Sequence, residues 1–330
     1  MLAACVRQEG LKTLDLSASS GIDFYTDPLM PSVAELDGTP VHDLLLSDPR
    51  ICDVWDDCYV LQNDKVFYFV NRETGAAEGG IDHVGRGPGE YIFPINYSRL
   101  GSVAAITDNL NGKVILYNRA GEWIGQREIP SSSMFYFWKE NGSVVTYSST
   151  SDHDLDFYEG DERIDSVDVA SGPDKTGSVF MTNLDLFNGQ YFFKPTIGDT
   201  MYRVTDEAKL VPYLILDKGN LRMPEAYYTK MSDWYAHSDD YITLEYARIA
   251  GDYAFVEYNF HEHMVRELWH LPTEKMLFKT TPQTSLMELG FPVEFNGETI
   301  PFWPTYVNGK DAYAVWGEED PVILRLRLSD

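Results

Sequence analysis

The 330-residue chain is 44% hydrophobic and 14% aromatic, with 25 Gly and 17 Pro, a composition that favours strands and turns over helices. Its 26 basic and 52 acidic residues leave a formal net charge of −26, which argues against binding to nucleic acids and electrostatic adsorption to anionic membranes. The acidic residues are spread along the whole chain, which predicts a soluble, self-repelling surface, with a cation-attracting cleft as the alternative.

Directly after Met1, the chain reads Leu2-Ala3-Ala4-Cys5, an apolar residue and two small residues before a cysteine, which is the form of a bacterial lipobox. We expect Cys5 to carry a lipid anchor, and the alternative is an ordinary free thiol. The basic and apolar leader that normally precedes such a cysteine is not in this sequence, so we expect the full gene to encode it upstream. No apolar run approaches the ~20 residues needed to cross a bilayer.

Short runs rich in β-branched and aromatic residues alternate with turn residues from Ile51 onward. Residues 1–30 show little periodicity and are interpreted as a lipoprotein tether and an entering segment, ahead of a single domain at residues 31–330. Units of strand, turn and strand recur roughly every 40–50 residues, which is typical of propeller blades. The clearest runs are Cys58–Leu61, Lys65–Val70, Val103–Thr107, Lys113–Tyr117, Trp123–Ile129, Tyr191–Lys194, Thr200–Val204, Leu210–Leu216, Tyr253–Tyr258, Val265–Trp269, Asp311–Trp316 and Val322–Leu328.

We therefore predict an all-β fold, a six-bladed β-propeller with about four antiparallel strands per blade. Residues before Ile51 are expected to add a strand to the last blade. Only Pro224–Met231 has helical character, with proline at its first position.

The two cysteines inside the domain are Cys52 and Cys58. If residues 56 and 57 form a two-residue hairpin turn, Trp55 faces Cys58 across the strands. Cys52 then lies on the opposite face of the sheet, and that register excludes a disulfide. An odd-length loop would place both thiols on one face and allow a bridge in an oxidising compartment.

The segment Val84–Tyr91 reads Val-Gly-Arg-Gly-Pro-Gly-Glu-Tyr. Three glycines and a proline within five positions cannot continue a helix or lie inside a central strand, so the segment is a shaped loop between two β units. We expect Gly87 or Gly89 to adopt a positive φ, or to pack too closely against its surroundings for a side chain.

This loop resembles the Gly-x-Gly-Pro-Gly-Glu-aromatic signature of the six-bladed β-propeller lipoproteins of Gram-negative envelopes, which are often described as TolB-like or NHL-like propellers. Asp108–Gly121, Asp199–Val204 and Asp320–Leu324 are similar to other blade segments of that family. The resemblance implies an exported propeller anchored by a lipidated cysteine. It implies no particular reaction, so no catalytic residue carries over from it.

Five residues are candidates for ligand binding. Arg86 and Glu90 could line the mouth of the propeller, or they could tie the loop to a neighbouring blade through charge-assisted hydrogen bonds. Trp138, Tyr235 and Trp303 lie in aromatic stretches near predicted loops between strands. They could stack on sugar rings or hold a partner peptide, and the alternative is that they pack between blades.

His261, His263 and His270 form the main histidine cluster. Their spacing differs from the His-Glu-x-x-His pattern of zincins, and Asn259–Glu262 is predicted to be a turn. Asp108–Gly112 lacks the alternating ligands of a calcium-binding loop and is better explained as a β-turn. We therefore predict no metal ion and no other cofactor. With 52 acidic residues, chance carboxylate pairs are inevitable, and no catalytic residue can be named.

The sequence thus favours a monomeric, non-enzymatic lipoprotein of the cell envelope, periplasmic or surface-facing, that binds a protein or a small-molecule or glycan ligand. One alternative is a hydrolase or lyase with a metal-based or carboxylate-based site at the mouth of the central channel. Another is a structural scaffold. Three convergent histidine or carboxylate ligands at the channel would favour the enzyme, and an aromatic rim without them would favour a binding protein.

Overall fold

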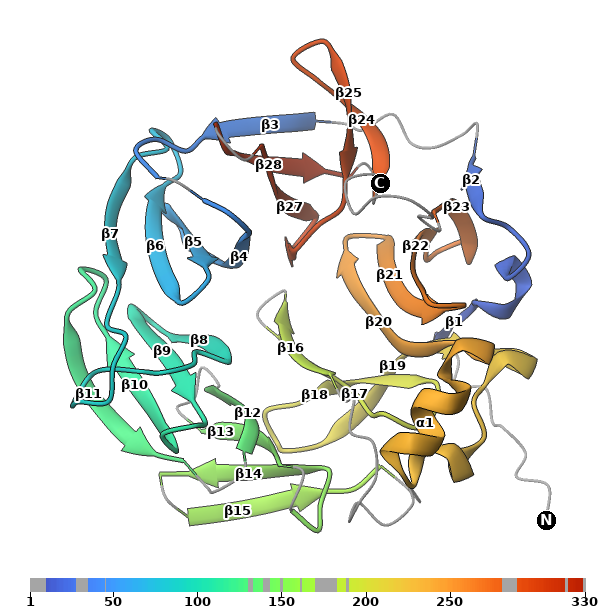
Figure 1. The fold of residues 1–330 in the computed structure, drawn as a ribbon, viewed down its shortest axis with the longest axis horizontal. Helices are drawn as coiled ribbons and strands as arrows, with labels where there is room; N and C mark the ends of the chain where they lie inside the picture. Colours follow the sequence, from blue (N-terminus) through green and yellow to red (C-terminus); the bar gives the residue numbers. More distant parts are fainter. Residues whose placement is uncertain are drawn as a thin grey trace.

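The computed structural model describes residues 10–27, 35–44, 46–129, 133–138, 143–148, 151–160, 162–169, 183–187, 190–280, 290–317 and 320–328. The predicted lipidation site, Cys5, lies outside these residues. Six antiparallel sheets of four main strands are arranged radially around a central axis (Figure 1), which confirms the predicted six-bladed β-propeller.

The first three blades follow one another along the chain, and each begins with the strand nearest the axis. Blade 1 comprises β4 (Pro49–Val54), β5 (Cys58–Asn63), β6 (Val66–Asn71) and β7 (Ala77–Ile81); blade 2 comprises β8 (Asn96–Leu100), β9 (Val103–Asp108), β10 (Lys113–Tyr117) and β11 (Trp123–Glu128); blade 3 comprises β12 (Ser133–Trp138), β13 (Val144–Ser148), β14 (Leu155–Glu159) and β15 (Glu162–Val167).

The other three blades complete the ring. Blade 4 comprises β16 (Asn183–Phe187), β17 (Gln190–Lys194), β18 (Thr200–Val204) and β19 (Leu210–Asp217); blade 5 comprises β20 (Thr243–Ala250), β21 (Tyr253–Phe260), β22 (His263–His270) and β23 (Lys275–Thr280); blade 6 comprises β26 (Tyr306–Asn308), β27 (Asp311–Trp316), β28 (Val322–Arg327) and β3 (Glu35–Pro40). In blade 6, β3 pairs antiparallel with β28, with Leu36 opposite Leu326. A strand from before Ile51 therefore joins the last blade, as predicted.

Two further N-terminal strands pair with the outer edges of blades 4 and 5, and the sequence analysis did not anticipate them. β1 (Lys12–Asp15) runs parallel to β19, and β2 (Phe24–Thr26) runs antiparallel to β23. The 3-10 helix η1 (Ser17–Ser19) lies between them. The described N-terminal segment thus borders three consecutive blades (4, 5 and 6) before the chain enters blade 1 (Figure 1).

A short helical insertion separates blades 4 and 5. It contains η2 (Gly219–Leu221), η3 (Glu225–Tyr228), α1 (Met231–His237) and η4 (Ser238–Asp240). The helix predicted at Pro224–Met231 is confirmed only in part: η3 forms within it, but Lys230 is extended (φ −139°, ψ 140°), and the α-helix begins only after it. Burial of Tyr228 and Trp234 in one small cluster fixes this arrangement. None of the helices in the described segments is both long and apolar enough to span a membrane.

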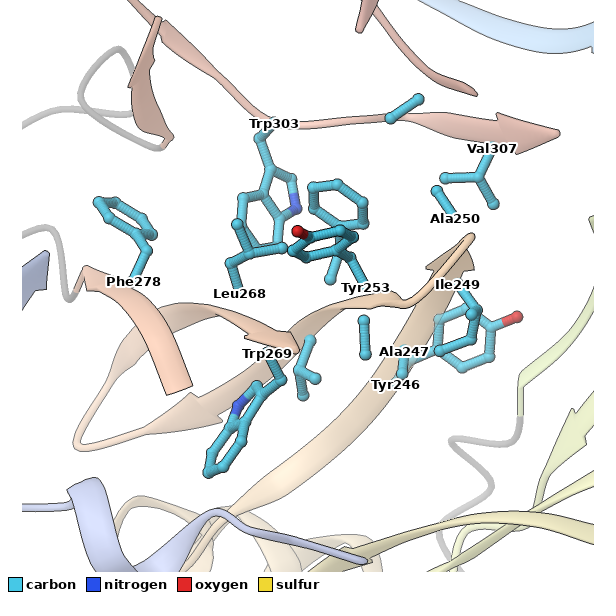
Figure 2. Close-up of a cluster of buried hydrophobic side chains, with 14 of the residues drawn as sticks. Tyr246, Ala247, Ile249, Ala250, Tyr253, Leu268, Trp269, Phe278, Trp303 and Val307 are labelled. Carbon is cyan, nitrogen blue, oxygen red and sulfur yellow. The ribbon is translucent and has the colours of Figure 1, made fainter. Parts of the chain in front are cut away.

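The hairpin of β24 (Phe291–Phe295) and β25 (Glu298–Phe302) lies between blades 5 and 6 and helps to fill the space there. Phe291 and Phe302 are fully buried, and their ring centroids are 5.5 Å apart. Figure 2 shows the neighbouring core, in which the indole of Trp303 points toward Leu268 of blade 5. Apolar packing between blades, rather than within one sheet, therefore holds this part of the ring together.

The hairpin that joins β4 and β5 has the predicted two-residue turn, since the backbone N–H of Trp55 donates to the oxygen of Cys58 at 2.8 Å. The predicted opposite placement of Cys52 is wrong, because the register shifts between Ile51 and Asp53. This bulge adds a residue and lets Cys52 pack against the cluster that contains Trp55 and Cys58. Both thiols are nevertheless free.

The glycine-rich loop connects β7 of blade 1 to β8 of blade 2. Gly89 has a φ of +70°, and a Cβ placed there would lie 2.6 Å from the ring of Trp123, which confirms the prediction for this loop. Lys113 Nζ donates to the oxygen of Gly87 at 3.0 Å, and the hydroxyl of Tyr117 donates to the oxygen of Gly89 at 2.8 Å. The loop is therefore fastened to blade 2.

Candidate functional site

The axis of the propeller holds a cavity of about 400 Å³, which we call the channel cavity. Every blade contributes wall residues from its innermost strand or from the segment directly before it. Blade 5 also contributes Glu257 of β21 and Arg266 of β22. Lining residues on the first three blades are Arg50, Ile51, Cys52, Ile95, Asn96, Tyr97 and Phe137; those on the last three are Asn183, Leu184, Asp185, Leu186, Phe187, Tyr246, Arg248, Glu257, Arg266, Trp303, Pro304, Thr305, Tyr306 and Val307.

One side of the channel cavity carries an ordered group of charged residues on blade 5. Arg248 Nη1 lies 3.1 Å from Glu257 Oε2, and Arg266 Nε lies 2.8 Å from Glu257 Oε1, so one carboxylate bridges two guanidinium groups. Arg248 Nε is also 3.8 Å from Asp185 Oδ2 on blade 4. The guanidinium of Arg266 lies 5.2 Å from the ring centre of Trp303, within cation–π range. This group joins three blades at the cavity wall.

Asp53 forms a second connection between inner strands. This buried carboxylate accepts hydrogen bonds from Trp55 Nε1 at 2.9 Å and from the Tyr306 hydroxyl at 3.1 Å, and Arg99 Nε lies 3.2 Å away. Burial raises the pKa of Asp53, whereas Arg99 and the hydrogen bonds oppose that rise. Blades 1, 2 and 6 are thus tied together beside the channel.

Arg50 and Cys52 share one polar partner on the wall of blade 1. Gln62 Oε1 accepts hydrogen bonds from Arg50 Nε at 2.9 Å and from Arg50 Nη2 at 2.5 Å. The thiol of Cys52 lies 3.6 Å from the same oxygen. Burial raises the pKa of Cys52 to about 12, so this thiol stays protonated and is a poor nucleophile near neutral pH.

A second cavity of about 460 Å³ shares Leu186 with the channel cavity. Trp138 and Arg203 are among its lining residues. The guanidinium of Arg127 lies 5.1 Å from the ring centre of Trp138. Trp138 is itself buried, so only part of its ring can meet a ligand.

The structure separates the five predicted ligand-binding residues. Trp303 lines the channel cavity and Trp138 lines the neighbouring cavity. Tyr235 is 64% exposed on α1, away from both cavities, with its ring beside Trp234. Glu90 Oε2 accepts a hydrogen bond from the backbone N–H of Gly87 at 2.8 Å, and Arg86 is exposed. Binding by any of the five remains a prediction.

The histidines do not converge. His261 and Glu262 form the turn between strands, with φ values of 52° and 64°, whereas Asn259 and Phe260, which were predicted to belong to the turn, end β21. His263 begins β22 and His270 ends it, and His270 Nδ1 lies 2.8 Å from the hydroxyl of Thr273. Within the described part of the chain, no three His, Cys, Asp or Glu side chains group as metal ligands would.

Sequence reasoning missed the arginines of the channel, Arg50, Arg248 and Arg266. A usable signal exists in β20, which reads Thr-Leu-Glu-Tyr-Ala-Arg-Ile-Ala, because Glu245 and Arg248 interrupt an otherwise apolar strand. Charged residues in an inner strand must face a partner or the axis. Recognising that signal requires knowing first that the strand is an inner one.

The fold and the lined channel define a six-bladed β-propeller with a polar and aromatic central cavity. The chain belongs to the family described as Domain of unknown function (DUF4934), which matches residues 44–323. No curated protein shows significant sequence similarity to the chain.

Solved structures share this fold. A protein of Bacteroides fragilis NCTC 9343 that is predicted to be exported has a TM-score of 0.69 at 16% identity, over 94% of this chain and 99% of that one. A member of the DUF4221 family from Bacteroides vulgatus ATCC 8482 has a TM-score of 0.51 at 10% identity, over 93% and 98%. Virginiamycin B lyase from Staphylococcus aureus, crystallised as an inactive variant with quinupristin, has a TM-score of 0.47 at 10% identity, over 89% and 100%.

Proposed function

We propose that the protein is a non-enzymatic, envelope-anchored propeller that binds a small ligand in the channel cavity. The observation that carries this proposal is the cavity itself. Its volume of about 400 Å³ lies within the range of small-molecule sites, which is about 300–1,000 Å³. Its wall combines aromatic side chains, which can pack against a ring, with ordered charged groups, which can fix the orientation of a ligand.

Polar atoms left without partners support the same proposal. Oδ1 of Asn96 and Nε1 of Trp303 are buried and have no hydrogen-bond partner among the described residues. Both residues line the channel cavity. Because a buried polar group without a partner costs free energy, a ligand or water that reached these two atoms through a small shift of the wall would gain from pairing with them.

The envelope location is the second part of the proposal. It rests on the lipobox form of Leu2–Cys5, on the resemblance of the glycine-rich loop to TolB-like and NHL-like lipoproteins, and on the shared fold of a protein predicted to be exported. In this proposal, the tether lies ahead of β1, the entering segment within residues 1–30 adds β1 and β2 to blades 4 and 5, and the chain is a monomeric propeller. The alternative of a hydrolase or lyase stays a prediction: Asp185 and Glu257 lie in the wall of the channel cavity, but among the described residues no three His, Cys, Asp or Glu side chains group as metal ligands would.

Ligand binding is tested with a panel of sugars and small ring compounds by ligand-observed NMR. Thr305→Trp places a bulky side chain at an exposed position of the cavity wall, and we expect it to weaken binding at least tenfold. Tyr235→Ala removes an aromatic side chain on α1 and should leave affinity unchanged. Binding that survives Thr305→Trp but is lost in Tyr235→Ala would move the site out of the channel.

Anchoring is tested by expressing the complete gene with its leader and separating membranes from the soluble fraction. Wild type should partition with membranes and Cys5→Ser should not, because the thiol is the proposed attachment point of the lipid. Equal partitioning of the two proteins would refute lipidation and leave the ligand proposal untouched.

A further inference from the structure

Arg50 is held at the channel cavity by a neutral residue. Its Nε and one hydrogen of Nη2 are directed to Gln62 Oε1. Gln62 is only 6% exposed, and its Nε2 donates to the backbone oxygen of Asp64 at 2.8 Å, which fixes the direction of the amide. A buried glutamine thus orients the guanidinium without neutralising its charge.

The charge of Arg50 is uncompensated in the part of the chain that the structure describes. Arg248 and Arg266 share Glu257, but no carboxylate of the described residues lies within ion-pair distance of Arg50. The wall of the channel cavity carries three arginines and two carboxylates, and therefore one positive charge in excess. This excess stands out in a chain with a formal net charge of −26.

The free donors of Arg50 have a defined geometry. A guanidinium has five N–H groups, and Gln62 occupies only the side formed by Nε and Nη2. The end of the group, formed by Nη1 and the second hydrogen of Nη2, has no partner among the described residues. Two parallel N–H donors match the two oxygens of a carboxylate, and Arg50 is exposed enough to be reached.

We propose that Arg50 anchors the ligand of the channel cavity and that this ligand is a small, ring-bearing organic carboxylate. The inference rests on the proposed function and narrows it to a ligand class. A single uncompensated cation suits a monoanion, whereas the second charge of a phosphate monoester would lie in the cavity that holds Asp185 and Glu257. The aromatic side chains Tyr97, Phe137 and Trp303 offer the ring an apolar wall.

The test uses matched pairs that differ in the carboxylate: D-glucuronate and D-glucose, benzoate and benzyl alcohol, nicotinate and nicotinamide. Binding to the whole protein is measured by ligand-observed NMR and, for binders, by calorimetry. We expect at least one carboxylate to bind wild type at least tenfold more tightly than its neutral counterpart. Carboxylates that bind no more tightly than their counterparts would overturn the inference.

Two variants address the role of the guanidinium. Gln62→Glu keeps the shape of the residue but pairs Arg50 with a negative charge, and Arg50→Gln removes the cation at an exposed position. Each should lower carboxylate affinity at least tenfold, whereas Gln126→Glu, the same change in the hydrogen bond to the Gly89 N–H, should not. Undiminished affinity in Arg50→Gln would overturn the inference even if Gln62→Glu proved unable to fold.

The outcomes separate this inference from the proposed function. If neutral compounds bind and Thr305→Trp weakens them, the channel binds ligands but the carboxylate class is wrong. If no compound of the panel binds in the channel, the proposed function and this inference both fail.

Discussion

Gly89 is the residue at which the glycine-rich loop tolerates least change. Its φ of +70° opposes a side chain, and so does the ring of Trp123, which would lie 2.6 Å from a Cβ at this position. Gly89→Val should lower the free energy of unfolding by about 1–3 kcal/mol in urea titrations. The matched change Gly125→Val, in β11 with its nearest neighbour at 3.9 Å, should have little effect. Equal costs at both positions would contradict this account of the loop.

A buried cluster links blades 4 and 5 through Lys194, Lys218 and Glu245. Both lysine ammonium groups lie close to Glu245 Oε1, at 2.6 and 2.5 Å. Burial lowers the pKa of Lys194 to about 8, and Glu245 opposes that shift only in part. For Glu245 the attraction of the two lysines outweighs burial and lowers its pKa. The buried cluster therefore destabilises the charged form of Lys194, which has a lowered pKa, while it stabilises the charged form of Glu245.

The lowered pKa of Lys194 determines how the free energy of unfolding changes with pH. Between the folded pKa of Lys194, about 8, and its unfolded value near 10.4, the unfolded chain binds more protons, so stability rises with pH. Relative to Lys194→Met, which cannot titrate, wild type should gain about 1–3 kcal/mol in free energy of unfolding from pH 7 to pH 10. A difference that stays constant or falls over this range would show that burial does not control this lysine.

Individual residues were predictable to different degrees. The positive φ at Gly89 followed from local sequence, because turns and close approaches leave a local composition signal. Trp303 was named as a candidate and does line the channel cavity, although most of its ring packs between blades 5 and 6. Arg50 was not named, since its role depends on Gln62 across the hairpin and on residues from other blades.

Among the elements, the N-terminal strands β1 and β2 are joined by a segment that is anchored through one buried group. Ser19 and Tyr258 donate to Glu267 Oε1 at 2.5 and 2.6 Å, and Lys279 Nζ donates to the backbone oxygen of Ser19 at 2.8 Å. Glu267 also accepts from Trp269 Nε1 at 2.8 Å. All of these contacts are buried. Burial strengthens each hydrogen bond while every group has its partner, and it makes the loss of one partner costly for the groups that remain.

Glu267→Ala should therefore destabilise the protein by about 3–5 kcal/mol, because it leaves the Lys279 charge buried without a carboxylate. The control is Glu274→Ala, which removes another acidic contact to the N-terminal segment, a half-exposed pair with Lys12 at 3.7 Å. It should cost less than about 1 kcal/mol. Urea denaturation measures both, and similar losses would argue that the buried network does not anchor this segment.

The middle strands of the blades were largely predictable, whereas the innermost strands and the outer strands β7, β15 and β23 were not. β10 was placed correctly at Lys113–Tyr117, whereas β8, β16 and β26 were missed. Inner strands border the cavity on one edge and carry polar or charged residues there, so they lack the apolar alternation that marks a half-buried strand. The elements that build the candidate site were thus the hardest to see.

For the whole molecule, repeat spacing and the lack of a linker were sufficient to predict a single six-bladed ring, and β3 completes it in blade 6 as expected. The channel cavity could not be predicted, because it exists only where six inner strands meet. Its lining is drawn from positions more than 250 residues apart in sequence, between Arg50 and Val307. No local sequence pattern indicates that these distant residues meet in one cavity.

Hydrogen–deuterium exchange with the tightest-binding compound of the carboxylate panel tests the central claim, that the channel is the ligand site. The account predicts slower exchange in peptides that cover β16 and the segment from Trp303 to Asn308, with no change in the glycine-rich loop or in α1. Protection confined to Val84–Tyr91 or to Met231–His237, with the inner strands unchanged, would contradict it.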